Sequence, residues 1–578
     1  MVIEQNKFYE LLKEKEQLID TEIEALSLWK YSFQTVYLNL LYLAEKVDID
    51  GNGDSAMDYF ARTAAIFGLV RDKCQGHDSY GTTWNALSQT LKDKQFFVDM
   101  ETLYAYGHFS MLMPQIHRTV FQIDKKSETS FNLSFQTAEM LEAEKKDRLL
   151  SILFQQLSIQ YIRQRELDQY FMEKIKIGNT ELEDYDIHWM TDMYQFNIKH
   201  RYRTEILSDA VLSETIGITN ADYDHFCSSI RACSDFLLTF GRAFKTLSDK
   251  ISDEQKEEKE QLFGEYLEWT TCTLMYQILE IMIDLSGLSE TKFKTLLSYY
   301  CQIYIGVPDT SYSENAFCGD GYLPPFLLMP ERVIFSPLAI RYLYTFDNLL
   351  YSVNKRQNAL FANTISKNLE PNLISQIHRN FSNFQNLNGK KNIPIPGGEI
   401  DYIVLCEEQY VCITFQVKAT LSPSSSRTVS RVESRSLEGI EQINHFEGLD
   451  KQVQLQTING AFGKTFKKLN FINILLLRSC AGSEKVWTSG VTITNYHLLT
   501  GLLGRKLKNG DYNFSSFGKE LDEYLDEMLA LSKPEVNEEK LVIDDITIKF
   551  PDITFDDIKA KCKNFQDCNN IKDFQSAV

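Results

Sequence analysis

The sequence predicts a multidomain protein in which a large all-α N-terminal region is followed by an α/β domain. Apolar residues recur at helical spacing through the first two thirds of the chain, as at Leu149, Leu153 and Leu157. Short, mostly apolar segments, which are typical of strands covered on both faces, come later, at 411–417 and 471–477. The chain has 578 residues, so more than one hydrophobic core is expected.

These patterns divide the chain into four expected parts. A break near Ser130 separates two helical parts, and four prolines between 324 and 337 mark the approach to the α/β domain. A helix over about 340–367 is expected to bridge the two. The expected parts are a helical N-terminal region (1–130), a helical region for sensing or partner binding (131–368), the α/β domain (369–510) and an acidic C-terminal helix and tail (511–578).

The α/β part has an ordered succession of expected elements. An apolar-periodic helix opens at 369–371, where a proline suits the first helical turn. A Gly-Gly turn at 397–398 leads into two strands, which a hairpin turn at 408–409 connects. The later expected elements are a helix over 433–449, strands over 471–477 and 486–493, a helix from about Tyr496, and a strand at 541–548 in the tail.

Four polar side chains lie on the two central strands. Because side chains alternate along a strand, Glu399 and Asp401 share one face of the first strand. Gln416 and Lys418 share one face of the second. The turn at 408–409 places Asp401 opposite Gln416 and Glu399 opposite Lys418. A shift of one residue would turn the two pairs to opposite faces, so this register is a prediction for the structure to test.

These residue types suit a divalent metal held against a phosphodiester. The carboxylates of Asp401 and Glu399 and the amide oxygen of Gln416 are hard ligands, which Mg²⁺ or Mn²⁺ prefers. The remaining positions around such an ion are left for water and a substrate phosphate. A compact ammonium such as that of Lys418 can orient the attacking water or stabilise charge developing on the phosphate. The predicted chemistry is metal-assisted hydrolysis.

The order Glu399-Ile-Asp401, a short gap, then Gln416-Val-Lys418 resembles the PD-(D/E)xK nuclease superfamily. Within it, the nearest likeness is to the Mrr-type restriction endonucleases and their NERD-like relatives. Members of the superfamily usually carry Glu or Asp where this chain has Gln416, whereas the Mrr-type branch uses Gln. The resemblance implies a restriction-endonuclease-like domain with a mixed central sheet. It also implies catalytic roles for the four strand residues and for an acidic residue on the preceding helix, for which Glu370 is the candidate.

The resemblance spans about 369–508 and extends to the helix after the lysine strand. There, Gln442 followed four residues later by Phe446 is similar to a Gln-x-x-x-aromatic element of some nucleases in the superfamily. Gln442 is therefore a candidate nucleic-acid contact. The alternative is a polar helix face with one packed aromatic residue.

The distribution of charge bears on nucleic-acid binding. The whole chain carries a net charge of −20, but 371–510 holds 16 Lys and Arg against 10 Asp and Glu. A basic segment is what a phosphate-binding surface requires. Arg427, Arg431 and Arg435 follow Lys418 at four-residue spacing, in a stretch whose first half is expected to be a loop. They are candidate phosphate contacts, and the alternative is that they are ordinary solvated arginines.

Several other classes of site are excluded. The segment 48–59 begins like a calcium loop, but Tyr59 stands where a bidentate Glu is needed. The 11 cysteines include no C-x-x-C pair, which argues against a zinc finger, and their odd number argues against a disulfide scaffold. The N-terminus is polar, and no apolar run is long enough to span a bilayer. We expect a soluble, cytoplasmic protein without a membrane partner.

The main hypothesis is a Mg²⁺-dependent (or Mn²⁺-dependent) endodeoxyribonuclease of the kind found in restriction and anti-phage defence. DNA is then the expected partner, the helical region is expected to bind a protein partner, and the chain is expected to form a homo-oligomer. One alternative is a catalytically inactive nuclease-like module that binds nucleic acid or a protein. Another is an RNA-cutting toxin, because the sequence does not separate DNA from RNA as the substrate.

Overall fold

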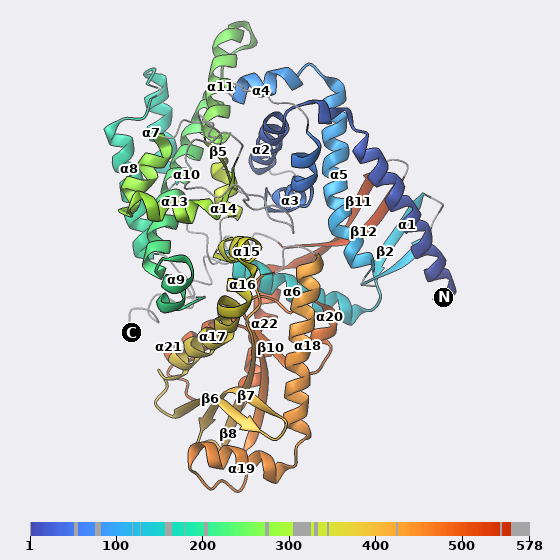
Figure 1. Cartoon of the computed structure of the whole chain (residues 1–578), viewed down its shortest axis with the longest axis vertical. Helices are drawn as coiled ribbons and strands as arrows, with labels where there is room; N and C mark the ends of the chain where they lie inside the picture. The colour runs from blue at the N-terminus through green and yellow to red at the C-terminus, as the bar shows by residue number, and fades with distance from the viewer. Residues whose placement is uncertain are drawn as a thin grey trace.

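The computed structural model has a helical upper part and an α/β lower part, with α6 and α15 between them (Figure 1). This arrangement confirms the predicted order of a large helical region followed by an α/β domain with a mixed sheet. The structure describes residues 2–50, 56–74, 83–117, 120–125, 127, 129–156, 164–179, 181–200, 206–271, 277–303, 325–328, 333–343, 346–422, 426–543 and 546–555.

The N-terminal region is built mainly from helices. Among the described residues, no helix is both long enough and apolar enough to cross a bilayer. The helices up to residue 298 are α1 (Val2–Glu24), η1 (Ser27–Lys30), α2 (Phe33–Asp50), α3 (Ala56–Lys73), α4 (Thr83–Thr90), α5 (Lys94–His117), α6 (Ala138–Gln156), α7 (Gln164–Lys176), α8 (Asp184–His200), α9 (Asp209–Ile216), α10 (Asn220–Ser248), η2 (Asp253–Gln255), α11 (Lys256–Thr271), α12 (Gln277–Ser286) and α13 (Glu290–Ser298).

Helix α10 lies at the centre of this region. Its start is fixed by a capping box, in which the Thr219 hydroxyl accepts from the Asp222 amide and the Asp222 carboxylate accepts from the Thr219 amide. The helix packs against α7, α8, α11 and α12. Arg242 of α10 donates to Glu45 of α2 over 2.7 Å, which joins it to the first helices of the chain.

Two small sheets add to the helical region, and the sequence patterns did not indicate either as a sheet there. One has the strand order β1-β2-β12-β11, with β12 parallel to β2, so the C-terminal hairpin completes a sheet begun near residue 121. The strand predicted at 541–548 covers the end of one strand and the start of the next. The strands are β1 (Phe121–Lys125), β2 (Ser130–Phe135), β11 (Pro534–Ile543) and β12 (Ile546–Phe555).

The second small sheet leads into the connection between the two parts. Its order is β3-β4-β5. The helix predicted over 340–367 is several shorter pieces, and Pro371 lies inside α17, not in its first turn. The elements are β3 (Cys301–Ile303), β4 (Phe326–Leu328), β5 (Val333–Phe335), α14 (Pro337–Leu343), α15 (Phe346–Arg356), α16 (Asn358–Leu360), the π-helical η3 (Phe361–Ile365) and α17 (Ser366–Phe381).

The α/β domain contains a five-stranded mixed sheet of order β10-β9-β8-β7-β6. Strands β6, β7 and β8 form an antiparallel meander, and β9 and β10 continue the sheet in parallel after a helical crossover. The elements are β6 (Leu387–Ile395), β7 (Gly398–Cys406), β8 (Val411–Lys418), α18 (Ser426–Gly448), α19 (Lys451–Phe462), β9 (Asn470–Leu477), α20 (Glu484–Trp487), β10 (Thr492–Asn495), α21 (Tyr496–Lys508) and α22 (Phe517–Ser532).

Helices cover both faces of this sheet, which explains why its central strands are mostly apolar. On the face covered by α17, Phe381 lies 5.7 Å from the ring of Phe415 on β8. On the other face, Phe446 of α18 belongs to a buried cluster with Ile403 and Leu405 of β7. Every residue of β8 is buried. A strand in this position is mostly apolar. Because polar residues are costly to bury, the few that it contains need a structural or chemical reason.

Two predicted elements of the domain are wrong in detail. Helix α18 begins at Ser426, seven residues before the predicted start at Glu433, so part of the stretch that was expected to be a loop is helical. The strand predicted over 486–493 starts only at Thr492, and Val486 and Trp487 belong to α20. The indole of Trp487 donates to Asp147 of α6 over 3.1 Å, so this part of the predicted strand contacts a helix that is distant in the sequence.

The two parts of the molecule share buried contacts. The Asp147 carboxylate also accepts from the amides of Ala481 (2.6 Å) and Gly482 (3.1 Å), and burial raises the pKa of Asp147 to about 7. One apolar cluster runs without a break from Phe236 of α10 to Phe415 of β8. The helical region therefore packs against the α/β domain and supports it directly.

Candidate active site

The predicted register of the two central strands is present in the structure. Tyr402 pairs with Phe415 and Cys406 with Val411, which is the predicted register, but the two predicted pairs Asp401–Gln416 and Glu399–Lys418 lie beyond the last paired residues. The pairing stops at Tyr402, so the start of β7 and the end of β8 separate beyond it. The turn between β6 and β7 contains Gly397, whose φ of 82° is a conformation that glycine adopts readily. The candidate residues lie at this open end of the β7–β8 hairpin.

Asp401 is held against the neighbouring strand. The backbone amide of Val417 donates to its Oδ2 over 2.7 Å. Burial is the main cause that raises the pKa of Asp401, the nearby carboxylates of Glu370 and Glu399 add to the rise, and the Val417 amide and Lys418 oppose it, so that the pKa is about 6. A half-buried carboxylate with acidic neighbours gains from a cation, and this is the electrostatic environment that a metal ligand requires.

Gln416 supplies a buried amide to the same place. It is 3% exposed, and its Nε2 donates to the backbone oxygen of Glu399 over 2.8 Å. Its Oε1 is buried and has no hydrogen-bond partner within the described part of the chain. A buried oxygen acceptor without a donor carries a desolvation cost, which a metal ion or a substrate group would remove.

Lys418 is almost completely buried, with 4% of its side chain exposed. Its Nζ lies 3.5 Å from Oε1 of Glu438 on α18. A Cβ added to Gly439 would lie 3.2 Å from Cε of Lys418 and 2.6 Å from Leu475, so the glycine allows α18 to approach the strand closely. The sequence patterns did not single out Glu438, although its position three residues after Arg435 puts both on one helix face.

Arg435 and Glu370 also meet at this site. Nη2 of Arg435 donates to Oε1 of Glu370 over 2.9 Å, and Nη1 of Arg435 donates to Glu438. Together with Lys418, these residues form a row of alternating charges that runs from α17 across α18 to β8. We call this row the site ion-pair chain: Glu370, Arg435, Glu438 and Lys418. Glu370 therefore lies near Asp401, as the resemblance implied, but its partner is an arginine that was expected to contact phosphates.

The remaining predicted residues lie at different distances from this centre. Glu399 is exposed at the start of β7, and Arg431 is exposed on α18 one turn before Arg435. The side chain of Arg427 is outside the described residues. Gln442 lies on α18 seven residues after Arg435, and its buried Oε1 has no hydrogen-bond partner in the described structure. Glu438, Arg435 and Gln442 share the helix face that covers the site.

The donor set fits a hard divalent cation in chemistry. Two oxygens, from Asp401 and from the partnerless amide of Gln416, come from adjacent strands, and Mg²⁺ commonly takes few protein ligands and keeps several waters. Among the described residues, no three His, Cys, Asp or Glu side chains form a group that could hold a metal ion. The fit therefore depends on the Gln416 amide together with Asp401, and Glu370 and Glu399 supply negative charge nearby.

The chain matches no protein-family model, no curated protein and no solved structure. What the site can do follows from its own geometry and chemistry.

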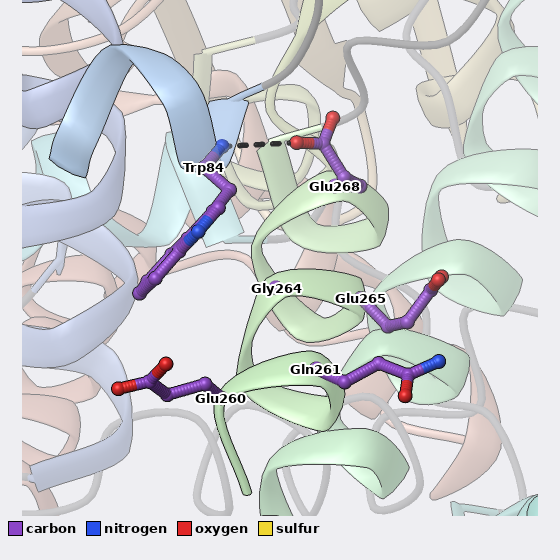
Figure 2. Close-up of a pocket in the computed structure, with 6 residues that line it drawn as sticks. All are labelled: Trp84, Glu260, Gln261, Gly264, Glu265 and Glu268. Atoms are coloured by element: carbon purple, nitrogen blue, oxygen red, sulfur yellow. Dashed lines mark hydrogen bonds between the residues drawn. The ribbon is translucent and has the colours of Figure 1, made fainter. Parts of the chain in front are cut away.

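A pocket lies in the helical region, between α4 and α11. Figure 2 shows Trp84 beside the part of α11 that carries Glu260, Glu265 and Glu268, with the Trp84 amide donating to Glu268 over 3.0 Å. Its lining is acidic, so it would repel a nucleic-acid backbone. The pocket has no metal-binding group and no nucleophile among its lining residues, and it adds nothing to the site on β7 and β8.

Proposed function

We propose that the protein is a metal-dependent nuclease that hydrolyses phosphodiester bonds of DNA. The observation that supports this most strongly is the convergence of Asp401, Gln416 and Lys418 at the open end of one hairpin in a mixed five-stranded sheet. All three are buried or half-buried polar residues on strands that are mostly apolar. Such residues are costly to bury, so their presence together favours a chemical role over a structural one.

Each residue of the site has its own proposed role in the reaction. Asp401 and the Gln416 amide would hold Mg²⁺ or Mn²⁺, which supplies polarisation of the phosphate and an acidified water when bound. The Lys418 ammonium has three donors and can orient the attacking water or stabilise the charge that grows on the phosphate oxygens. The Val417 amide fixes the carboxylate of Asp401, so this group needs no rearrangement during the reaction.

The biological role proposed with this activity comes from the resemblance to Mrr-type restriction endonucleases. We propose an effector of restriction or anti-phage defence that acts in the cytoplasm as a homo-oligomer. The helical region would sense a signal or bind a protein partner. Its buried contacts with the α/β domain, through Asp147 and the shared apolar cluster, give such a signal a physical route.

A cleavage assay tests the activity. Duplex DNA, single-stranded DNA and RNA are incubated with Mg²⁺ or Mn²⁺ and with the parent protein, Asp401→Ala or Lys418→Ala. We expect each variant to cut about 100- to 1,000-fold more slowly than the parent. Glu408→Ala and Lys468→Ala are matched controls, because both residues are exposed at the far end of the same sheet, and they should cut at the parent rate. Equal cutting by all five proteins would show that this site is not responsible.

The second candidate is an inactive nuclease-like module that binds nucleic acid or a protein. The site ion-pair chain favours it, because Lys418 and Glu370 already have partners within the protein. DNA binding that weakens with salt, survives EDTA and Asp401→Ala, and never leads to cutting would support this candidate. The same substrate panel separates a third candidate, an RNA-cutting toxin, because it would cut RNA and spare DNA.

A further inference from the structure

Arg435 forms ion pairs beside the candidate metal site. Its guanidinium contacts carboxylates from two different helices, Glu370 on α17 and Glu438 on α18. Glu370 is also one of the carboxylates that raises the pKa of Asp401, so it belongs to the electrostatic environment of the candidate metal ligand. The Arg435 guanidinium therefore neutralises negative charge that would otherwise lie beside the candidate metal site.

The ion pairs of Arg435 are exposed enough for Arg435 to exchange its partners. The side chains of Arg435 and Glu370 are 40% and 32% exposed, and that of Glu438 is 42% exposed. Ion pairs at such exposure contribute little to stability, because water competes for both partners. Arg435 also lies one turn from the exposed Arg431 on the same helix, so a guanidinium that left Glu370 would lie on a surface that already carries positive charge.

We propose that Arg435 is a switching residue of the site. In the absence of a divalent cation it neutralises Glu370 and Glu438. When a cation binds beside Asp401, Arg435 leaves Glu370 and contacts a substrate phosphate. This inference rests on the proposed nuclease function and extends it, because it makes phosphate binding by Arg435 depend on metal binding. It also gives a reason for an arginine at this position, since the guanidinium fork can bridge two carboxylates and can later hold a phosphate.

Calorimetric titration with Mn²⁺ tests the first half of the proposal. The full chain is compared with Arg435→Gln and with Arg431→Gln, and Asp401→Ala defines the background from ions bound elsewhere. We expect Arg435→Gln to bind Mn²⁺ about 3- to 5-fold more tightly, because no guanidinium competes for Glu370. Arg431→Gln removes the same charge one turn away, and it should stay within about twofold of the parent.

Binding of a labelled 20-base-pair duplex tests the second half. Fluorescence anisotropy is measured in EDTA and in Ca²⁺, and gels confirm that the duplex stays intact. In EDTA, we expect Arg435→Gln to bind DNA as the parent does, because Arg435 is held by the carboxylates. In Ca²⁺, the variant should bind about tenfold more weakly, which is the loss of one charged hydrogen-bonding contact. Arg431→Gln should weaken binding by the same factor in both conditions.

The outcomes separate this proposal from the proposed function. If the parent binds no more Mn²⁺ than Asp401→Ala does, there is no metal site and both ideas fail. If Asp401→Ala abolishes Mn²⁺ binding but Arg435→Gln binds like the parent, the metal site stands and the switching role is wrong. An equal tightening by Arg431→Gln would show a simple charge effect and would also overturn the switching role.

Discussion

Two groups of charged side chains flank the end of β8, and they differ in burial. Beyond Lys418, Arg478 and Asp347 form an ion pair whose side chains are 4% and 3% exposed. The site ion-pair chain is built from the same chemical groups, but Lys418 is its one buried member, and its carboxylates and Arg435 are about one third exposed or more. Loss of one partner from a buried pair leaves an uncompensated charge, whereas an exposed pair exchanges its partners with water at little cost. The first group is therefore suited to fixing the strand and the second to chemistry.

The buried pair joins the helical region to the lysine strand. Asp347 lies on α15 and accepts from the Ser422 amide over 2.8 Å as well as from Arg478. Arg478 also donates to the backbone oxygen of Thr420 over 3.1 Å, and its amide donates to the backbone oxygen of Lys418 over 3.2 Å. The segment that follows Lys418 is thus held from two sides, and the position of the ammonium depends on it.

The largest expected effect is that of Asp347→Ala. The substitution leaves the Arg478 guanidinium buried without its carboxylate, which costs about 3–5 kcal/mol. Hydrogen–deuterium exchange of peptides covering 411–422 measures the local opening free energy, and the variant should lower it by that amount. Tyr351→Phe is the milder control: it removes one hydrogen bond to the Ser422 oxygen (2.7 Å) and should cost about 1 kcal/mol. A loss below 1 kcal/mol in Asp347→Ala would contradict the comparison.

The second prediction concerns Asp401 and pH. Its folded-state pKa of about 6 lies above the ordinary value, so the folded protein binds this proton more tightly than the unfolded chain does. The stability that Asp401 contributes is fully present below about pH 4 and is lost as the pH rises through about 6. In EDTA, we expect Asp401→Asn to be about 1–3 kcal/mol more stable than the parent at pH 8 and equal to it at pH 4.

Thermal melts at both pH values measure this difference. The exposed Glu408 on the hairpin turn supplies the control, since Glu408→Gln should leave the melting temperature unchanged at either pH. An Asp401→Asn variant that melts below the parent at pH 8 would mean that this carboxylate stabilises the fold, and the argument that it is kept for chemistry would fail.

The elements around the site were predictable because their signals are local. The segments 411–417 and 471–477 are mostly apolar and form β8 and β9. The turn at 408–409 fixed the register, since a short hairpin leaves few ways to pair its strands. The alternation of side chains then placed Asp401 and Gln416 on a common face.

The features that could not be predicted depend on distant partners. Strand β12 pairs with β2, more than 400 residues earlier in the chain, and nothing in either segment specifies the other. Trp487 belongs to the short helix α20 where a strand was predicted, and its indole donates to Asp147 of α6, a contact that the local sequence does not indicate. Glu438 was missed because its contact with Lys418 depends on how α18 is rotated against the sheet, and the close approach of Gly439 sets that rotation.

Gly439→Ala tests whether that close approach matters for activity. The added methyl group would lie 3.2 Å from Cε of Lys418 and 2.6 Å from a terminal methyl of Leu475, so the Leu475 and Lys418 side chains or α18 itself have to shift. A displaced ammonium is expected to lower the cleavage rate about tenfold, because catalytic groups lose efficiency with small misplacements. Gly448→Ala is the matched control at the end of the same helix, since an added Cβ there meets nothing within 4 Å. Equal cleavage rates for both variants would show that the role of Lys418 does not depend on how closely α18 packs against the strand.

The smallest expected effect on stability is that of Glu438→Gln, and it completes the comparison with Asp347. Glu438 is 42% exposed, its contact with the buried Lys418 is long at 3.5 Å, and a glutamine keeps a side-chain oxygen there, so the loss of its charge should change the opening free energy of 411–422 by less than about 1 kcal/mol. The same exchange measurement that detects Asp347→Ala should therefore place Glu438→Gln close to the parent. A large loss here would mean that the site ion-pair chain holds the strand in place, and Arg435 would then not be free to exchange its partners.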